Sequence, residues 1–394
     1  MESEENTEGC GQGLLMKNLE FVNWFEEHTD RIEAYFEALH DMPEPGFQEE
    51  RTSAYLAERL REWGWEVHTG FAGTAVLGVQ RGVEEGPCVC LRADMDALTF
   101  TIGGERRYIH ACGHDANCAQ VLAVAEAAVK TGFPKRGIFM VLFQPCEEGQ
   151  KGALCVLESG VLKDVQYLFS THLRPCEELP LGKACPSVRH GAMTVAQTMI
   201  HGRSAHGARP GQGINAVSVG CEIVGRVNGL KELDGTPFSI KATQFHSAPG
   251  SENIIPADVT VVFDLRAQTN ACMEVLRERL ETITADICAK YGAEGNVQYT
   301  GHVPAAQEAA AAVEAAADAI RTVYGEDGYA PPVQTAGGED FHYYTEVMPW
   351  IKAAVLGFGA DMRFGLHHPQ MSFDRAVLPL AAKTLAVTLT NIIE

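Results

Sequence analysis

The chain lacks a basic excess, a long apolar run and the features of an export signal. Its 52 Asp and Glu residues outnumber 31 Lys and Arg residues, which gives a formal net charge of −21. Because no cationic excess is available to neutralise phosphates, we expect neither nucleic acid nor an anionic membrane as a partner. No stretch approaches the ~18 apolar residues of a spanning helix. Residues 1–11 are acidic and polar rather than basic and apolar, so we expect a cytoplasmic protein.

The remaining composition is that of an ordinary globular protein. Hydrophobic residues make up 46% of the 394-residue chain and charged residues 21%, which excludes disordered and fibrous classes. The length suffices for two or three domains with full cores. Twelve cysteines are many, but in a long chain without an export signal we expect them to stay reduced.

Two short segments bring together side chains that bind metal ions. Residues 110–115 (HACGHD) offer the thiolate of Cys112 and the imidazole of His114, and residues 143–148 (FQPCEE) place Glu147 and Glu148 after an apolar strand. A thiolate, an imidazole and a carboxylate suit zinc, or manganese or cobalt with more oxygen ligands. One carboxylate can then bind metal while the other moves protons. The plainer alternative is a buried thiol beside a solvated strand end.

Alternating patterns predict the fold. Residues 74–79, 88–92, 137–143 and 166–170 have the pattern of strands, and 115–130 and 152–159 that of helices, the first beginning at Asp115 as N-cap. Such alternation predicts an α/β protein with a mostly parallel sheet flanked by helices. In such sheets, functional residues lie at the carboxyl ends of the strands. Asp94, Glu147, Glu148 and His172 all follow predicted strands.

The order of predicted strands and helices changes after residue 189. Segments 193–201, 214–227, 238–245, 259–266, 273–291 and 296–300 read as strand, helix, strand, strand, helix and strand, a β-α-β-β-α-β two-layer unit. We expect an inserted lid or dimerisation domain at 190–302, between the two parts of a catalytic domain at 1–189 and 303–394. An exposed sheet edge in such a unit favours pairing with a second copy, so we expect a homodimer.

Six ordered segments carry a resemblance to a known family. They are 92–98 (RADMDAL), 110–115, 143–148, 171–173 (THL), 337–341 (GGEDF) and 366–369 (LHHP). From about residue 40 to the end, the chain resembles the M20 metallopeptidase family, in its amidohydrolase branch of hippurate hydrolases, aminoacylases and auxin-conjugate hydrolases. The resemblance implies two divalent metal ions, Zn, Mn, Co or Ni.

The resemblance also implies roles for individual residues. The metal ligands would be Cys112, His114, Glu148, His172 and His367, with Cys112 bridging, Glu148 and His367 on one ion and His114 and His172 on the other. Glu147 would be the general base, although the roles of Glu147 and Glu148 could be exchanged. His172 could instead be a core histidine, and His368 could replace its neighbour His367.

Further positions would contact substrate or support the ligands. His206 would stabilise the oxyanion, from the same subunit or from a partner. Asn253 and Arg266 would bind the substrate's carbonyl and carboxylate, although Arg266 could equally form a strand-end salt bridge. Asp94 and Asp96 would support ligating histidines. Glu339 would lie near the site and receive a substrate amine.

Three departures from the family pattern bear on substrate. The loop between residues 98 and 110 is short and lacks the usual proline and methionine, Asn117 replaces a common histidine, and Cys146 replaces an alanine. These departures leave the metal ligands in place but weaken the transfer of substrates from better-known members. The resemblance implies hydrolysis of the amide bond of N-acyl amino acids or related conjugates, without naming the acyl group, the amino acid or the metal. The alternatives are a dipeptidase with the same site and a catalytically silent binding protein of the same fold.

Overall fold

The computed structural model describes residues 19–393, except 232, 234, 248 and 249. The chain forms two compact units, which we describe separately. The first unit contains the described residues up to Arg189, together with Gln307–Val333 and the chain from Tyr343 onwards. The second unit contains His190–Ala306 and Gln334–His342.

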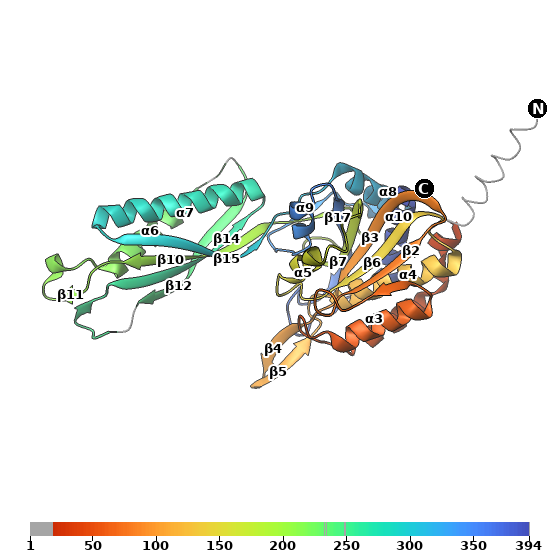
Figure 1. The fold of residues 1–394 in the computed structure, drawn as a ribbon, viewed down its shortest axis with the longest axis horizontal. Helices are drawn as coiled ribbons and strands as arrows, with labels where there is room; N and C mark the ends of the chain where they lie inside the picture. The colour runs from red at the N-terminus through yellow and green to blue at the C-terminus, as the bar shows by residue number, and fades with distance from the viewer. Residues whose placement is uncertain (1–18, 232, 234, 248–249, 394) are drawn as a thin grey trace, which may run out of the picture. The chain divides into compact units, whose positions relative to one another are not determined.

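A seven-stranded sheet forms the centre of the first unit, in the order β1-β2-β6-β3-β7-β17-β8 (Figure 1). The four inner strands β6, β3, β7 and β17 run parallel, and the remaining neighbours pair antiparallel. Strands buried on both faces need nearly continuous apolar sequence, which β6 has. The strands are β1 Glu66–His68, β2 Val76–Arg81, β3 Glu84–Asp94, β6 Arg136–Gln144, β7 Tyr167–Pro175, β8 Ala184–Cys185 and β17 Lys352–Met362.

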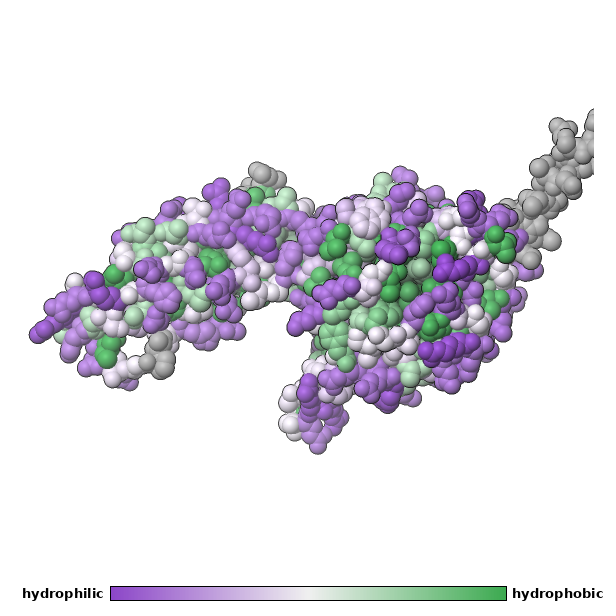
Figure 2. All heavy atoms as spheres, in the orientation of Figure 1, coloured by the Kyte–Doolittle hydropathy of each residue, from purple (hydrophilic) through white to green (hydrophobic). Residues whose placement is uncertain are grey.

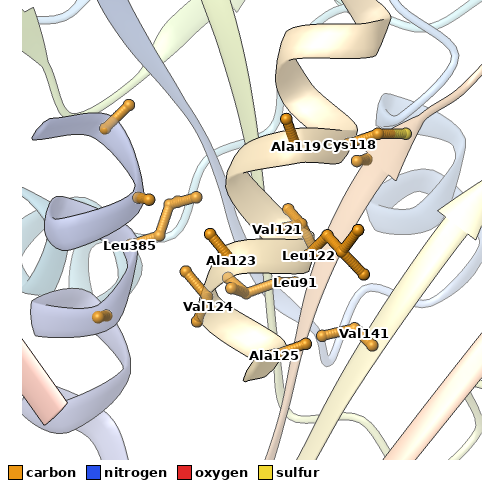
Figure 3. Packing of buried hydrophobic residues seen from close by; sticks show 14 of the residues in the cluster. Leu91, Cys118, Ala119, Val121, Leu122, Ala123, Val124, Ala125, Val141 and Leu385 are labelled. Atoms are coloured by element: carbon orange, nitrogen blue, oxygen red, sulfur yellow. The ribbon is translucent and has the colours of Figure 1, made fainter. Parts of the chain in front are cut away.

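Helices cover this sheet and complete its core. Helix α4 is buried along almost its whole length because it packs on β3 and also against α2 and α10. Figure 3 shows Val121, Leu122 and Val124 of α4 beside Leu91 of β3, with Leu385 of α10 across from them. The predicted α/β class with a sheet flanked by helices is therefore confirmed. The helices are α2 Thr29–His40, α3 Glu50–Glu62, α4 His114–Thr131, α5 Gly152–Ser159, α8 Ala310–Gly328, α9 His342–Val347 and α10 Val377–Ile393.

The start of α4 differs from the sequence-based expectation. Its N-cap is Gly113, whose φ of 90° is a left-handed conformation that glycine adopts without steric cost. Asp115 lies inside the helix, where its carboxylate bonds to the ring of His40. The prediction of Asp115 as N-cap was therefore wrong, because the side chain has a tertiary partner instead.

The segment expected as a loop between residues 98 and 110 is a β-hairpin. Strands β4 (Leu98–Ile102) and β5 (Glu105–Ile109) pair antiparallel around Gly103 and Gly104, both with positive φ. Two adjacent glycines are a strong signal for a tight hairpin turn. The hairpin projects from the first unit in Figure 1, and Figure 2 shows mainly hydrophilic residues on it.

The second unit is a four-stranded antiparallel sheet with two helices on one face (Figure 1). The sheet order is β12-β14-β10-β15, so β12 and β15 are its edges. Side chains of β10 and β14 alternate between buried and partly exposed, as expected when one face packs against helices. Asn215 and Thr269 cap α6 and α7 through their side chains. The elements are β10 Ala192–His201, β11 Ala205–His206, η1 Pro210–Gln212, α6 Ala216–Asn228, β12 Phe238–Ser247, β13 Ile254–Ile255, β14 Asp258–Ala267, α7 Asn270–Tyr291 and β15 Glu294–Val303.

Two short strands, β9 (Val188–His190) and β16 (Val333–Thr335), form a separate pair near the ends of the second unit. In the described part of the chain, no helix has both the length and the apolar character needed to cross a membrane.

Candidate metal centre

The carboxyl ends of the parallel strands in the first unit hold the candidate ligands. Strand β3 ends at Asp94, and Glu147 and Glu148 follow the end of β6. His172 lies on β7, and His114 is the first residue of α4. Candidate site residues from four segments therefore meet at the edge where α/β sheets usually carry their functional residues.

The donor atoms form two groups that share one thiol. The ligand atoms of Cys112, His114 and His172 all lie within 4.8 Å of one another, and so do those of Cys112, Glu148 and His367. Cys112 Sγ is 3.6 Å from His172 Nε2, and His367 Nε2 is 3.3 Å from Glu148 Oε1. A thiolate common to two donor groups can bridge two ions.

The two histidines of the first group have the correct nitrogen available. His114 Nδ1 lies 3.0 Å from the carbonyl oxygen of Asp96 and donates to it, while the buried Nε2 has no hydrogen-bond partner within the described residues. His172 Nδ1 likewise donates to the carbonyl oxygen of Leu173, at 2.6 Å. A partner on Nδ1 fixes the tautomer that leaves Nε2 as a metal ligand. These residues therefore fit a metal ion.

The electrostatic environment also favours metal binding by His172 and Cys112. Burial lowers the pKa of His172 to about 3, and the charge of Arg174 adds to the effect, so this ring is neutral and can donate its lone pair. Burial raises the pKa of the Cys112 thiol to about 12. A thiolate in this place therefore requires strong positive charge nearby, which a divalent ion would supply.

Charged neighbours shift the pKa values of His114 and Glu148 against the effect of burial. Burial alone would lower the pKa of His114, but the charge of Asp94 and the thiol of Cys112 outweigh it and raise that pKa well above its usual value. Burial likewise opposes ionisation of Glu148, but the hydrogen bond from His367 and the charge of His114 lower its pKa. This donor set therefore attracts a cation, and metal binding would displace the proton of His114.

Glu147 lies beside this donor set. Its Oε2 is 3.8 Å from His114 Nε2, and the ligand atoms of His114, Glu147 and Glu148 lie within 4.8 Å of one another. Glu148 belongs to a group with Cys112 and His367, whereas Glu147 does not. This arrangement allows Glu148 to act as a ligand and Glu147 to take a proton nearby.

The Asp96 carboxylate holds residues of the candidate metal centre in place. Its Oδ1 accepts the N–H of Glu147 and its Oδ2 the N–H of Glu148, both at 3.1 Å. Oδ1 also lies 3.3 Å from His114 Nδ1. One buried carboxylate thus contacts the backbone or ring of three candidate site residues.

Asp94 is fully buried and held by two donors. Arg92 Nη1 donates to Oδ2 at 2.7 Å, and Asn117 Nδ2 donates to Oδ1 at 2.8 Å. Burial opposes ionisation of Asp94, but the charges of His114 and Arg92 lower its pKa to about 2. Asn117 therefore supplies the contact that its departure from the family pattern put in question.

His368 and His367 have different surroundings. The ring of His368 stacks on Phe364 with centroids 4.8 Å apart, and its Nδ1 accepts the N–H of Gln370. His367 instead lies against Glu148, with a positive φ of 64°. The structure thus brings His367, and not its neighbour, into a candidate donor group.

The other predicted residues belong to the second unit. His206 and Asn253 are exposed and lie at the β11–β13 ribbon, where the N–H of Gly207 donates to the carbonyl oxygen of Asn253. Arg266 Nε donates to Asp264 at 3.0 Å. Arg266 is eight residues beyond the start of β14, about 26 Å along the strand from the end near the ribbon. In the second unit of a single chain, His206 and Asn253 are therefore neighbours, and Arg266 is distant from both.

Glu339 also belongs to the second unit. Its side chain is buried, and Oε1 accepts the N–H of Phe341 at 3.1 Å. This contact shapes the chain just before α9.

Sequence reasoning assigned no individual role to Arg92 or Glu49. Arg92 is fully buried in β3 and bonds to Gln144 and Ser170 as well as to Asp94. The signal was a charged residue directly after the apolar residues of a buried strand. Glu49 carried no comparable signal, because a carboxylate before a helix normally caps that helix.

Comparison with known proteins places this chain among hydrolases that act on amide bonds. Residues 90–391 match the family model described as Peptidase family M20/M25/M40. The chain belongs to this family, and the resemblance seen in its motifs is confirmed.

Relatives of known name match most of the chain. It is 27% identical to an N-acetylcysteine deacetylase of Bacillus subtilis, over 90% of this chain and 95% of that protein. It is 28% identical to an IAA-amino acid hydrolase of Arabidopsis thaliana, over 87% and 81%. A solved Bacillus subtilis structure, described as a dinuclear metal binding peptidase from the M20 family, shares the fold with a TM-score of 0.79 at 24% identity, over 93% and 99%.

Proposed function

We propose that this protein hydrolyses the amide bond of N-acyl amino acids or related conjugates, using two divalent metal ions. The observation that carries the proposal is the pair of donor groups that share Cys112, with Glu147 beside them. The N-acetylcysteine deacetylase among its relatives acts, by its name, on an N-acylated amino acid. Zn, Mn, Co and Ni all suit this mixed donor set.

The ligands would be Cys112, His114, Glu148, His172 and His367. When bound, the ions supply positive charge that acidifies water and polarises the scissile carbonyl. Glu147 accepts a proton from the attacking water as the new C–O bond forms. It then passes this proton to the leaving nitrogen as the C–N bond breaks, which leaves a carboxylate and a free amine.

His206, Asn253 and Arg266 would complete the substrate site. His206 donates a hydrogen bond to the oxyanion, Asn253 contacts the carbonyl, and Arg266 binds the amino-acid carboxylate as a planar fork. Glu339 would receive an amine where the substrate has one. Asp94 and Asp96 hold the ligating histidines and the loop of Glu147 in place.

The second unit, expected at 190–302, would form a homodimer. Its edge strand β12 is exposed from Lys241 to Ser247, which leaves hydrogen-bonding groups for a second copy. In addition, Arg266 is about 26 Å along β14 from the ribbon that carries His206 and Asn253. One second unit cannot present all three side chains to one small substrate. This separation favours a site to which His206 is contributed by the partner subunit.

Mixing two inactive variants tests the shared site. His206→Ala and Glu147→Gln each remove one component, and a mixed dimer with shared sites contains one intact site. We expect activity to return towards a quarter of wild type after subunit exchange, because half of the dimers are mixed and each has one working site of two. Co-purification of an untagged subunit with a tagged one after mixing is the control for exchange. No recovery despite exchange would show that each site is built from one chain.

A dipeptidase with the same centre is the second candidate. It is favoured by the solved structure described as a peptidase, although that similarity shows only the fold. The two activities differ in whether a free α-amino group is required. N-acetyl amino acids paired with dipeptides of the same C-terminal residue separate them directly.

The proposal is tested by turnover of this paired panel with protein loaded separately with Zn, Mn, Co and Ni. We expect N-acyl amino acids to be cleaved faster than matched dipeptides. Preference for dipeptides would favour the second candidate. Absence of turnover on both classes, with metal bound, would indicate a catalytically silent binding protein. The acidic charge is consistent with a small-molecule substrate in the cytoplasm, without nucleic acid or membrane as partner.

A further inference from the structure

Three successive backbone N–H groups in the loop of Glu147 are bound by two buried carboxylates. Asp96 accepts the N–H groups of Glu147 and Glu148. The preceding N–H, that of Cys146, donates to Glu49 Oε1 at 2.9 Å. The loop that carries the base is therefore held by carboxylates from two different segments of the first unit.

Glu49 does not have the usual role of a carboxylate before a helix. It occupies the N-cap position of α3, but its side chain makes no capping hydrogen bond there. Its second oxygen, Oε2, accepts from Thr74 Oγ1 at 2.6 Å. The residue is fully buried, and burying an ionised carboxylate costs several kcal/mol unless its partners compensate. Both oxygens of Glu49 are thus committed to positioning the chain beyond its own helix.

The Cys146 backbone needs such a restraint. Its φ of 54° is left-handed, which is unfavourable for a residue with a Cβ. A conformation of this kind persists where its surroundings hold it. The Cys146 side chain packs tightly by Gly46, since a Cβ on that glycine would lie 2.7 Å from Sγ. The turn at Cys146 sets the direction in which Glu147 leaves the loop.

We propose that Glu49 is a positioning residue for the general base. By holding the Cys146 N–H, it fixes the left-handed turn that directs the Glu147 carboxylate towards the metal centre. Thr74 in turn holds the Glu49 carboxylate in the required orientation. The inference rests on the proposed role of Glu147 as base.

The main test compares Glu49→Ala with Glu49→Gln. We expect Glu49→Ala to lower kcat about 10- to 100-fold through misplacement of the base, with KM changed less than about threefold and both metal ions retained. In Glu49→Gln the amide oxygen can still accept the Cys146 N–H while the amide nitrogen donates to Thr74. We therefore expect kcat to recover to within about fivefold of wild type.

Glu44→Ala is the matched control. Glu44 lies in the same segment and accepts the N–H groups of Arg51 and Thr52 at 3.2 and 3.0 Å, so its side chain supports α3 rather than residues 146–148. We expect this variant to be less stable but to keep the wild-type kcat at a temperature where it is folded. Should Glu49→Ala not fold, Glu49→Asp replaces it, since the shorter side chain cannot reach both partners, and kcat should fall about tenfold.

Three results would overturn the inference: wild-type kcat in folded Glu49→Ala or Glu49→Asp, no rescue by Glu49→Gln, or an equal loss of kcat in Glu44→Ala. Glu147→Gln, measured alongside, separates this inference from the function on which it rests. If Glu147→Gln keeps its turnover, the base assignment itself fails. If Glu147→Gln is inactive while Glu49→Ala is fully active, only the role of Glu49 is refuted.

Discussion

Replacing Asp96 by asparagine should damage metal binding and stability together. The carboxylate is almost fully buried and accepts the N–H groups of Glu147 and Glu148, with His114 Nδ1 3.3 Å away. An asparagine has the same shape but only one oxygen. In either orientation of the amide, its NH₂ group faces a backbone N–H, so one buried donor loses its partner.

The magnitude follows from these contacts. Leaving a buried donor without a partner costs about 1–3 kcal/mol, and the remaining bond loses the assistance of a charge, so we expect a loss of about 2–4 kcal/mol. This is a substantial part of a typical unfolding free energy of about 5–15 kcal/mol. Because His114 loses part of its support, metal affinity should fall about 10- to 100-fold.

Urea unfolding of the metal-free protein measures the stability change, and competition with a chelator measures metal affinity. Asp41→Asn, on an exposed position after α2, controls for the loss of one negative charge. Wild-type unfolding and wild-type metal affinity in Asp96→Asn would refute the role assigned to the Asp96 carboxylate.

Three other variants test separate parts of the site and its support. Glu147→Gln should keep its metals but lose kcat by several orders of magnitude, because the amide cannot accept a proton; kcat near wild type would exclude Glu147 as base. Cys112→Ser should lose metal and activity together, and full metal occupancy by elemental analysis would argue against the bridge. The hydrogen bond to Asp115 raises the pKa of His40, so this charge stabilises the fold below pH ~6.5 and is lost as pH rises through the raised pKa. His40→Gln should therefore lower the Tm more at pH 6 than at pH 9, and an equal decrease at both would contradict the charged pair.

The sequence predicted the centre of the first unit well because strand ends and ligand chemistry coincide there. Asp94, Glu147 and Glu148 follow apolar runs within a few residues, and His172 lies near the end of another strand. Such positions restrict these residues to one edge of a parallel sheet. The grouping around Cys112 depended on resemblance, because spacing alone cannot show which ligands are neighbours in space. Only the folded chain shows that His367 lies in a donor group while His368 stacks on Phe364.

Local patterns were less reliable where tertiary contacts decide the structure. Apolar residues recur at helical spacing over 18–39 and predict one helix there. From residue 19, where the description begins, that helix is interrupted at His28, whose φ and ψ of −127° and 31° are not helical. Glu49 and Asp115 both resemble helix caps in sequence, yet both side chains bond to distant segments. A cap and a tertiary ligand use the same carboxylate, and only the folded chain determines which partner it has.

The proposed mechanism requires two metal ions for turnover. Protein stripped with a chelator should be inactive on N-acyl amino acids, and titration with Zn or Mn should restore activity with metal content reaching two ions per chain. Cys112→Ser, titrated in parallel, should not reach that stoichiometry at the same free metal concentration. Full activity in protein that contains no metal by elemental analysis would contradict the proposed mechanism.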